Sequence, residues 1–242
     1  MEYLKIYNTL DSTNLEAQRL LAEGAAPNGL TLLALQQTHG KGQMGRAWIA
    51  EAGNHLSMTI IYRPAKMDPA ELTTLGMKIS LGIVEGLLFI NPDLKPLIKW
   101  PNDIYIHDKK LCGILIENAL AGNRVQHSII GIGMNVNEET FPSYIPNAIS
   151  LHLLTGEKYN VQEIALTIRH HVMAMFESSF PSWKVRYDQF IFGKDKHYTF
   201  LSGDQTFNAS VIGISDEGHL RLLTDGGHLK LFASHEVRWV VS

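Results

Sequence analysis

The chain has 242 residues, with 45% hydrophobic and 19% charged side chains, a globular balance that fits one large domain or a medium domain with a small appendage. Its formal net charge of −3 gives no overall attraction to nucleic acid, so any anion site must be local. The single cysteine, Cys112, excludes an internal disulfide or a multi-cysteine metal cluster and is typical of a reducing cytoplasm.

The N-terminal residues lack the basic segment and the apolar segment of a signal peptide. Lys78 and Glu85 interrupt the longest apolar stretch, so we expect no membrane span. These two observations predict a soluble cytoplasmic protein.

The first 35 residues predict two strands and one helix. Leu4–Tyr7 has the composition of a strand, and Asp11–Asn14 supplies capping residues for a helix that ends at Gly24. The apolar run Thr31–Leu35 is typical of a buried strand. This strand leads directly into a glycine-rich loop.

A strand and a long helix follow the loop. Leu56–Tyr62 predicts a strand that Pro64 ends, and Asp68 with Pro69 marks the start of a helix. Apolar residues then recur at helical spacing and predict a core-facing stripe: Leu72, Leu75, Ile79, Ile83 and Leu87.

The central part of the chain predicts consecutive strands at short spacing. These strands are Leu97–Trp100, Ile104–Ile106, Leu111–Ile116 and Ile129–Met134. His107–Lys110 supplies a tight turn, so at least two of the strands form a hairpin. With a helix over Gln162–Phe180, the pattern predicts an α+β fold whose mixed or antiparallel central sheet is flanked by helices.

The pattern changes after Trp183, where short strands alternate with glycine and aspartate turns. The expected strands are Tyr198–Phe200, Asn208–Ile214, Leu220–Leu223, Leu229–Phe232 and Val237–Val241. Short strands with close turns are typical of a small β-barrel. We therefore expect a catalytic domain over residues 1–188 and a barrel domain over residues 189–242.

The glycine-rich loop runs from Gly40 to Trp48 and contains three glycines, Lys41 and Arg46. Backbone N–H groups at glycines approach an anion closely, and the two cationic side chains add positive charge. A flexible turn is the alternative. Because a strand follows, the dinucleotide-binding form of this motif, which needs a helix, is disfavoured. Trp48 is equally suited to stacking on a base or to filling the core.

A second charged cluster surrounds the predicted hairpin. Lys99, Asp103 and Lys110 recur there, and lysines packed together repel one another unless an anion lies between them. Turn chemistry at Pro101–Asp103 is the alternative explanation. Cys112 is interpreted as a small core residue, since no general base is near it in sequence.

Four ordered motifs closely resemble those of biotin protein ligases. They are the stretch Gln36–Trp48, the run Lys99–Asp103, the run Lys110–Leu115 and the run Gly131–Asn137. The resemblance covers nearly the whole chain. It implies a sheet of the class II aminoacyl-tRNA synthetase and biotin ligase type with a C-terminal SH3-like barrel. Larger family members carry an N-terminal DNA-binding domain, and this chain resembles the short class without that domain or a repressor function.

The resemblance implies that biotin and MgATP form biotinyl-5′-AMP and that a carrier-protein lysine then attacks its acyl carbon. The implied catalytic residues are Lys110, Asp103 and Arg46. The implied biotin-binding residues are Ser12, Thr13, Gln36, Gly40, Lys41, Lys110 and Gly113. The implied ATP and adenylate residues are Lys41, Gln43, Arg46, Trp48, Asn102, Lys110 and Asn135. No metal ligand is implied beyond Mg²⁺ carried with ATP.

The implied partner is a biotin carboxyl carrier protein or domain, with no nucleic acid and no membrane. A homodimer through strands near Gly113–Asn118 is also expected. The family usually has arginine at the positions of Lys41 and Gln43, so adenylate retention is in question. A lipoate–protein ligase and a non-catalytic biotin- or nucleotide-sensing module are the alternatives.

Overall fold

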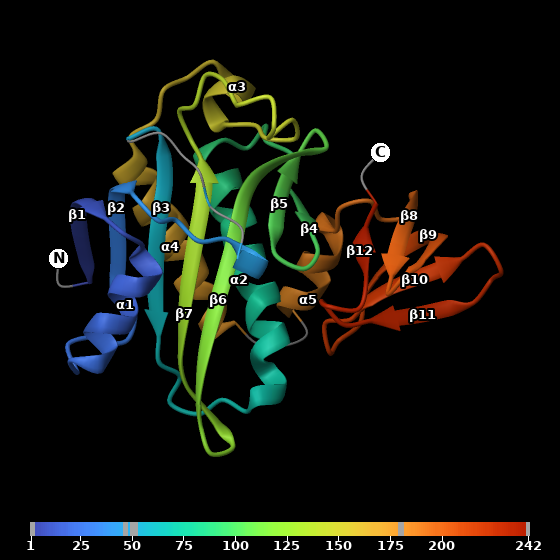
Figure 1. Ribbon diagram of the computed structural model, residues 1–242, viewed down its shortest axis with the longest axis horizontal. Coiled ribbons are helices and arrows are strands. Elements are labelled where there is room, and N and C mark those ends of the chain that lie inside the picture. The colour runs from blue at the N-terminus through green and yellow to red at the C-terminus, as the bar shows by residue number, and fades with distance from the viewer. Residues whose placement is uncertain (1–2, 46–47, 49–52, 179–181, 241–242) are drawn as a thin grey trace.

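The computed structural model describes residues 3–45, 48, 53–178 and 182–240, and these form two sheets with their helices (Figure 1). The first sheet and its helices comprise β1 (Leu4–Leu10), α1 (Thr13–Ala22), β2 (Thr31–Gln37), β3 (His55–Tyr62), α2 (Leu72–Ile90), β4 (Leu97–Lys99), β5 (Asp103–Ile106), β6 (Lys109–Ala121), β7 (Arg124–Asn135), α3 (Leu151–Thr155), α4 (Val161–Glu177) and α5 (Ser182–Tyr187). The second comprises β8 (His197–Ser202), β9 (Gln205–Ile214), β10 (Leu220–Thr224), β11 (Leu229–Phe232) and β12 (Arg238–Trp239). Short 3-10 helices lie at Gln43–Gly45, Pro69–Glu71 and Asp188–Phe190.

The first sheet is mixed, as the sequence predicts. Its seven strands lie in the order β1-β2-β3-β7-β6-β5-β4. Only β1 and β2 pair in parallel, and the remaining neighbours are antiparallel. The long β6–β7 hairpin crosses the middle of the sheet and places Gly113 opposite Gly133.

Helices α2 and α4 cover one face of this sheet, and α1 covers part of the other (Figure 1). Strand residues alternate between the two cores, so that Ile60 packs with α2 and α4 while Ile61 packs with α1. At Gly82 an added Cβ would lie 2.7 Å from Val172 Cα, which shows how closely α2 and α4 approach.

The predicted start of the α2 segment is confirmed in atomic detail. Asp68 Oδ1 accepts a hydrogen bond from the Ala70 amide, and Glu71 Oε2 accepts one from the Asp68 amide, which completes a capping box. Contrary to the sequence-based expectation, Pro69–Ile90 is long and apolar enough to cross a membrane. More than half of its apolar 18-residue window is buried inside the fold, so length and composition alone are weak evidence for a membrane span.

The hairpin between β5 and β6 is tighter than predicted. His107 and Asp108 alone form the turn, with φ of 50° and 59°, the left-handed conformation that two-residue hairpin turns require. Lys109 and Lys110 therefore belong to β6 and have fixed positions on the sheet. This fixes the backbone of Lys110 opposite Tyr105 in the β5–β6 ladder.

The second sheet is antiparallel, with the order β11-β10-β9-β8-β12. Its edge strands β11 and β12 do not pair with each other within the described residues, so the closed barrel expected from the sequence is not found. Strand β12 is shorter than predicted, and position 241 lies outside the described residues. Helix α4 likewise ends at Glu177, before the expected Phe180. The domain division at residues 188 and 189 stays a prediction.

Candidate active site

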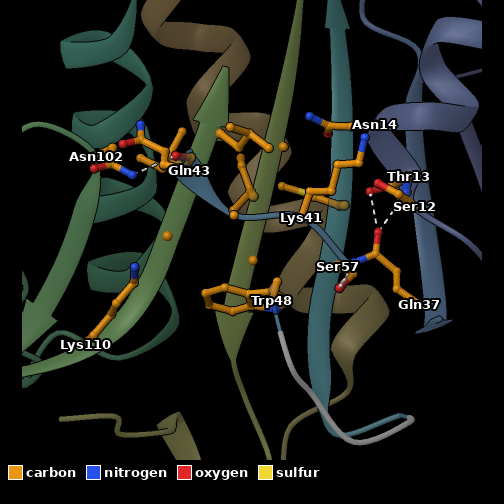
Figure 2. Close-up of a pocket in the computed structure, with 18 residues that line it drawn as sticks. Ser12, Thr13, Asn14, Gln37, Lys41, Gln43, Trp48, Ser57, Asn102 and Lys110 are labelled. Atoms are coloured by element: carbon orange, nitrogen blue, oxygen red, sulfur yellow. Dashed lines mark hydrogen bonds between the residues drawn. The ribbon is translucent and has the colours of Figure 1, made fainter. Parts of the chain in front are cut away.

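A pocket of about 50 Å³ lies on the sheet face opposite α2 and α4, where α1 begins (Figure 2). We call it the first cavity. Its lining combines the start of α1, the glycine-rich loop and the β6–β7 hairpin: Ser12, Thr13, Asn14, Gln37, Lys41, Gly42, Gln43, Trp48, Ser57, Met58, Asn102, Lys110, Gly113, Ile114, Leu115, Gly131, Ile132 and Gly133. Segments from both ends of the first sheet thus meet at one site.

Glycines of β6 and β7 form the floor of this cavity. An added Cβ at Gly133 would lie 2.5 Å from Trp48 Cε2, so the indole lies directly on the backbone there. At Gly113 the nearest atoms are Lys110 Nζ at 3.1 Å and Trp48 Cζ3 at 3.2 Å. Side chains at these two positions would displace the Trp48 ring or the Lys110 amine.

Gln37 holds the first turn of α1. Its Oε1 accepts hydrogen bonds from the Thr13 amide (2.8 Å) and from Thr13 Oγ1 (3.1 Å), and its Nε2 donates to Ser57 Oγ (3.1 Å). Ser12 is the N-cap residue and is almost fully buried, yet its side chain makes no capping hydrogen bond. The Ser12 hydroxyl therefore lines the cavity instead of capping the helix, the second of the two roles open to it from sequence.

Gln36, which the resemblance assigned to biotin binding, does not line the first cavity. Gln36 is exposed, and its Oε1 accepts only a long 3.5 Å hydrogen bond from Thr9 Oγ1. Gln37 lines the cavity in its place. The two residues are neighbours of the same type, so the sequence motif alone does not distinguish them.

Asn14 is a site residue that the sequence analysis treated only as a capping candidate. Its Oδ1 accepts a hydrogen bond from Thr59 Oγ1 (2.7 Å), and its Nδ2 donates to Glu117 Oε2 (2.6 Å). An added Cβ at Gly131 would lie 2.5 Å from Asn14 Oδ1. Asn14 therefore fixes α1 against β3, β6 and β7 at once.

Lys110 and Asp103 form an ion pair at the mouth of the cavity. Lys110 Nζ lies 2.7 Å from Asp103 Oδ1, and both side chains are partly exposed. The same amine lies 5.8 Å from the centre of the Trp48 ring. Lys110, Asp103 and Trp48 thus lie close together at this site.

A second cavity of about 620 Å³ adjoins the first. The two share the residues Gly42, Gln43, Trp48, Asn102 and Lys110. The second cavity is also lined by Asp103, Tyr105, Asn135, Phe141, Tyr144, Ile145, Pro146, Asn147 and Ala148. The segment 141–148 was not recognised from the sequence, where its proline and aromatic residues resemble an ordinary loop.

Backbone contacts fix this loop beside Lys110. The Lys110 amide donates to the Asn147 carbonyl (2.6 Å), and the Ile149 amide donates to the Lys110 carbonyl (3.0 Å). Asn135 Nδ2 donates to the carbonyls of Lys110 (3.3 Å) and Ile149 (3.0 Å). Asn135 therefore joins the loop to β6 as well as lining the second cavity.

The glycine-rich loop closes on itself through Gly40 and Trp48. The Trp48 amide donates to the Gly40 carbonyl (2.9 Å), and an added Cβ at Gly40 would lie 2.6 Å from the Trp48 carbonyl oxygen. Gly40 thus shapes the loop and is not part of the cavity lining. Lys41 and Gln43 line the first cavity. Arg46, predicted to be catalytic, lies outside the described residues.

Burial keeps two nearby titratable groups neutral. Burial, and secondarily the charge of Asp103, raises the pKa of Tyr105 to about 12. Burial also raises the pKa of the Cys112 thiol, whose side chain is inaccessible to solvent. Cys112 is therefore a core residue, as interpreted from the sequence, and neither group is an anionic nucleophile near neutral pH.

The described residues contain no group of three or more His, Cys, Asp or Glu side chains placed to hold a metal ion. Among the described residues that line the two cavities, the carboxylate is that of Asp103, which lines the second. One carboxylate suits a metal ion that arrives with bound phosphates better than a resident metal held by the protein alone.

Comparison with known proteins identifies the family. Residues 7–135, more than half of the chain, match the biotin/lipoate A/B protein ligase family. The protein belongs to this family. It is 33% identical over 242 residues to the bifunctional ligase/repressor BirA of Bacillus subtilis. This match covers 96% of the present chain and 73% of BirA.

Other relatives narrow the family assignment. The chain is 37% identical over 131 residues to the biotin–[acetyl-CoA-carboxylase] ligase of Paracoccus denitrificans, covering about half of each protein (52% and 51%). The biotin protein ligase of Aquifex aeolicus, solved with biotin and ATP, superposes with a TM-score of 0.81 at 28% identity over the full length of both chains. These matches confirm the expected enzyme class. Within the biotin/lipoate ligase family, the protein is a biotin protein ligase.

Proposed function

We propose that the protein forms biotinyl-5′-AMP from biotin and ATP and transfers the biotinyl group to a lysine of a biotin carboxyl carrier protein or domain. The observation that carries this proposal is the Lys110–Asp103 ion pair at the junction of the two cavities. One cation and one carboxylate at that point suit two successive reactions at the same acyl group.

In the first reaction, a carboxylate oxygen of biotin attacks the α-phosphorus of ATP, and the bond to the bridging oxygen breaks to release pyrophosphate. Negative charge gathers between carboxylate and phosphate, and the Lys110 ammonium stabilises that charge. Lys41 and Arg46 of the glycine-rich loop supply further positive charge. Mg²⁺ bound to the ATP phosphates would neutralise part of their charge.

In the second reaction, the carrier lysine attacks the acyl carbon, the bond to the AMP oxygen breaks, and the amine loses a proton. The Asp103 carboxylate lies next to Lys110 and suits the role of orienting that amine or accepting its proton. Because the acyl group is already activated as a mixed anhydride, the reaction needs no enzyme nucleophile.

The two cavities suggest where the substrates bind. The first cavity offers Ser12, Thr13 and Gln37 as hydrogen-bonding groups for the polar ring of biotin, over the glycine floor. The second cavity, with Trp48 and Asn135, has the size and aromatic lining for the nucleotide. The acyl phosphate would then form between them, beside Lys110.

Incubation with radiolabelled biotin or lipoate, MgATP and an apo carrier domain tests this function. We expect biotin, and not lipoate, to become covalently bound to the carrier lysine. A carrier with that lysine changed to arginine serves as the control. Transfer of lipoate would favour the lipoate ligase alternative, and binding without turnover would favour the sensing module.

We also infer that this protein acts without a DNA-binding repressor role, since its net charge of −3 gives no general attraction to DNA.

We infer a homodimer from the strand pairing of β6. This strand pairs with β5 only up to Gly113, and from Ile114 onward its ladder partner is β7, on its other edge. Gel-shift assays and sedimentation at several concentrations test the two inferences separately. We likewise infer that the second sheet belongs to an SH3-like unit.

A further inference from the structure

Lys99 lies in an aromatic enclosure built by both units of the protein. Its Nζ is 4.4 Å from the ring centre of Tyr105, and 5.2 Å from those of Phe192 and Trp239. Tyr105 belongs to the first sheet, and Trp239 belongs to β12 of the second sheet. Phe192 lies in the segment that leads into the second sheet. One cation thus contacts three rings from three separate segments.

The walls of this enclosure support one another. The Phe192 and Trp239 rings meet edge to face at 5.6 Å, and Tyr105 lies 5.2 Å from Phe192. Trp239 Nε1 donates to the Trp100 carbonyl (3.3 Å), and the Phe192 amide donates to the Ile98 carbonyl (2.9 Å). Phe192 and Trp239 therefore contact the backbone on both sides of Lys99, at Ile98 in β4 and at Trp100 directly after it.

The enclosure is directly connected to the candidate active site. Lys99 faces Asp103 in the β4–β5 ladder, and Tyr105, which packs under the Lys99 ammonium, lines the second cavity with Asp103 and Lys110. Burial lowers the pKa of Lys99, and the charge of Asp103 opposes that shift. A cation partly removed from water interacts more strongly with aromatic rings than one at the surface.

We propose that Lys99 is a positioning residue for biotin transfer, which fixes the Asp103 carboxylate by joining the β4–β5 hairpin to Phe192 and Trp239. This inference rests on the proposed function. The C-terminal unit thereby contributes to the second reaction without touching the substrate. Lys99 itself holds the hairpin and takes no proton.

Measuring the two half-reactions separately tests this role. Pyrophosphate release without carrier reports adenylate formation, and single-turnover transfer from preformed biotinyl-AMP reports the second step. We expect Lys99→Met to slow transfer at least about tenfold and to leave the KM for biotin within about twofold of the wild-type value. Lys99→Arg, which keeps a cation for the rings, restores most of the rate.

Two further variants separate positioning from folding. Lys230 Nζ lies 5.5 Å from the Phe207 ring on the second sheet, and Lys230→Met removes that exposed cation–π contact as a matched control with no effect on transfer. Trp239→Leu removes one wall and leaves Lys99 in place. Trp239→Leu and Lys99→Met both remove the same contact. The double variant should therefore lose less transfer rate than the two single losses combined would predict.

Each outcome decides the matter. Wild-type protein without biotin adenylation would contradict the proposed function, and this inference with it. Active wild-type protein with normal transfer by Lys99→Met would overturn the inference alone. An equal loss in both half-reactions that Lys99→Arg does not restore would also overturn it. If Lys99→Met does not fold, normal transfer by Trp239→Leu overturns the inference and slowed transfer supports it.

Discussion

The Lys110 ammonium lies 2.7 Å from the Asp103 carboxylate, across the β5–β6 ladder and above Gly113. The two-residue turn at His107 and Asp108 sets the register in which Lys110 faces Tyr105. A register shift between Ile104 and Tyr105 then places Gly113 opposite Asp103. Two local backbone features thus bring opposite charges to the junction of the two cavities.

Lys110→Ala should lower the rate of adenylate formation by about 100-fold or more, since it removes the cation that stabilises the acyl phosphate. Pyrophosphate release with biotin and MgATP measures this rate. Lys109→Ala, at the exposed neighbouring position of the same strand, is the matched control and should retain the wild-type rate. Full adenylation by Lys110→Ala would remove its assigned role.

Asp103→Asn should lower transfer more than adenylation, by roughly 100-fold, because the amide cannot accept the proton of the incoming amine. Single-turnover transfer from purified biotinyl-AMP to an apo carrier isolates this step. Equal losses in the two half-reactions would show that Asp103 acts only by holding Lys110.

Gln37→Ala should raise the KM for biotin about tenfold, because the first turn of α1 loses two hydrogen bonds to the Gln37 side chain and Ser57 of β3 loses a third. Gln36→Ala is the matched control, since Gln36 is exposed and outside the first cavity. Steady-state kinetics with varied biotin distinguish them. A larger effect at Gln36 would restore the assignment made from the sequence.

Much of the fold was predictable because its signals are local. The capping box at Asp68 and the apolar stripe of α2 specify that helix without tertiary information. The tight turn at His107 similarly indicates a hairpin and hence an antiparallel arrangement. Closure of the second sheet depends on pairing between distant edge strands, and the sequence carries no local signal for it.

The end of β2 shows why Gln37, and not Gln36, lines the first cavity. Side chains along β2 alternate between the two faces of the sheet. Because Ala34 faces the site, this alternation alone would also turn Gln36 toward it. The ladder with β3 ends at Ala34, and beyond it Gln37 reaches Thr13 and Ser57. The second-cavity loop was missed for a different reason, since its position depends on backbone contacts with Lys110.

Gly133→Ala should weaken biotin-dependent adenylation at least about tenfold, because the new methyl group would overlap the Trp48 ring. Gly226→Ala is the matched control, with its nearest neighbour, a His228 ring atom, 3.4 Å from an added Cβ. Pyrophosphate release measures both variants. An unchanged rate in Gly133→Ala would show that the contact between Trp48 and the glycine floor is not needed for catalysis.

Gln43→Arg should slow the release of biotinyl-AMP several-fold, because Gln43 lines both cavities and the new guanidinium adds positive charge next to the phosphate. Filter-binding release of radiolabelled adenylate measures this rate. Gln205→Arg, an exposed position on β9, controls for added surface charge. If release is no slower in Gln43→Arg, the uncharged side chain does not limit adenylate retention.

A crystal structure with biotinyl-5′-AMP bound tests the central claim most directly. The account predicts that Lys110 Nζ lies within about 3 Å of an acyl-phosphate oxygen, with the biotin ring beside Thr13 and Gln37. An adenylate bound with its phosphate remote from both Lys110 and Lys41 would contradict it.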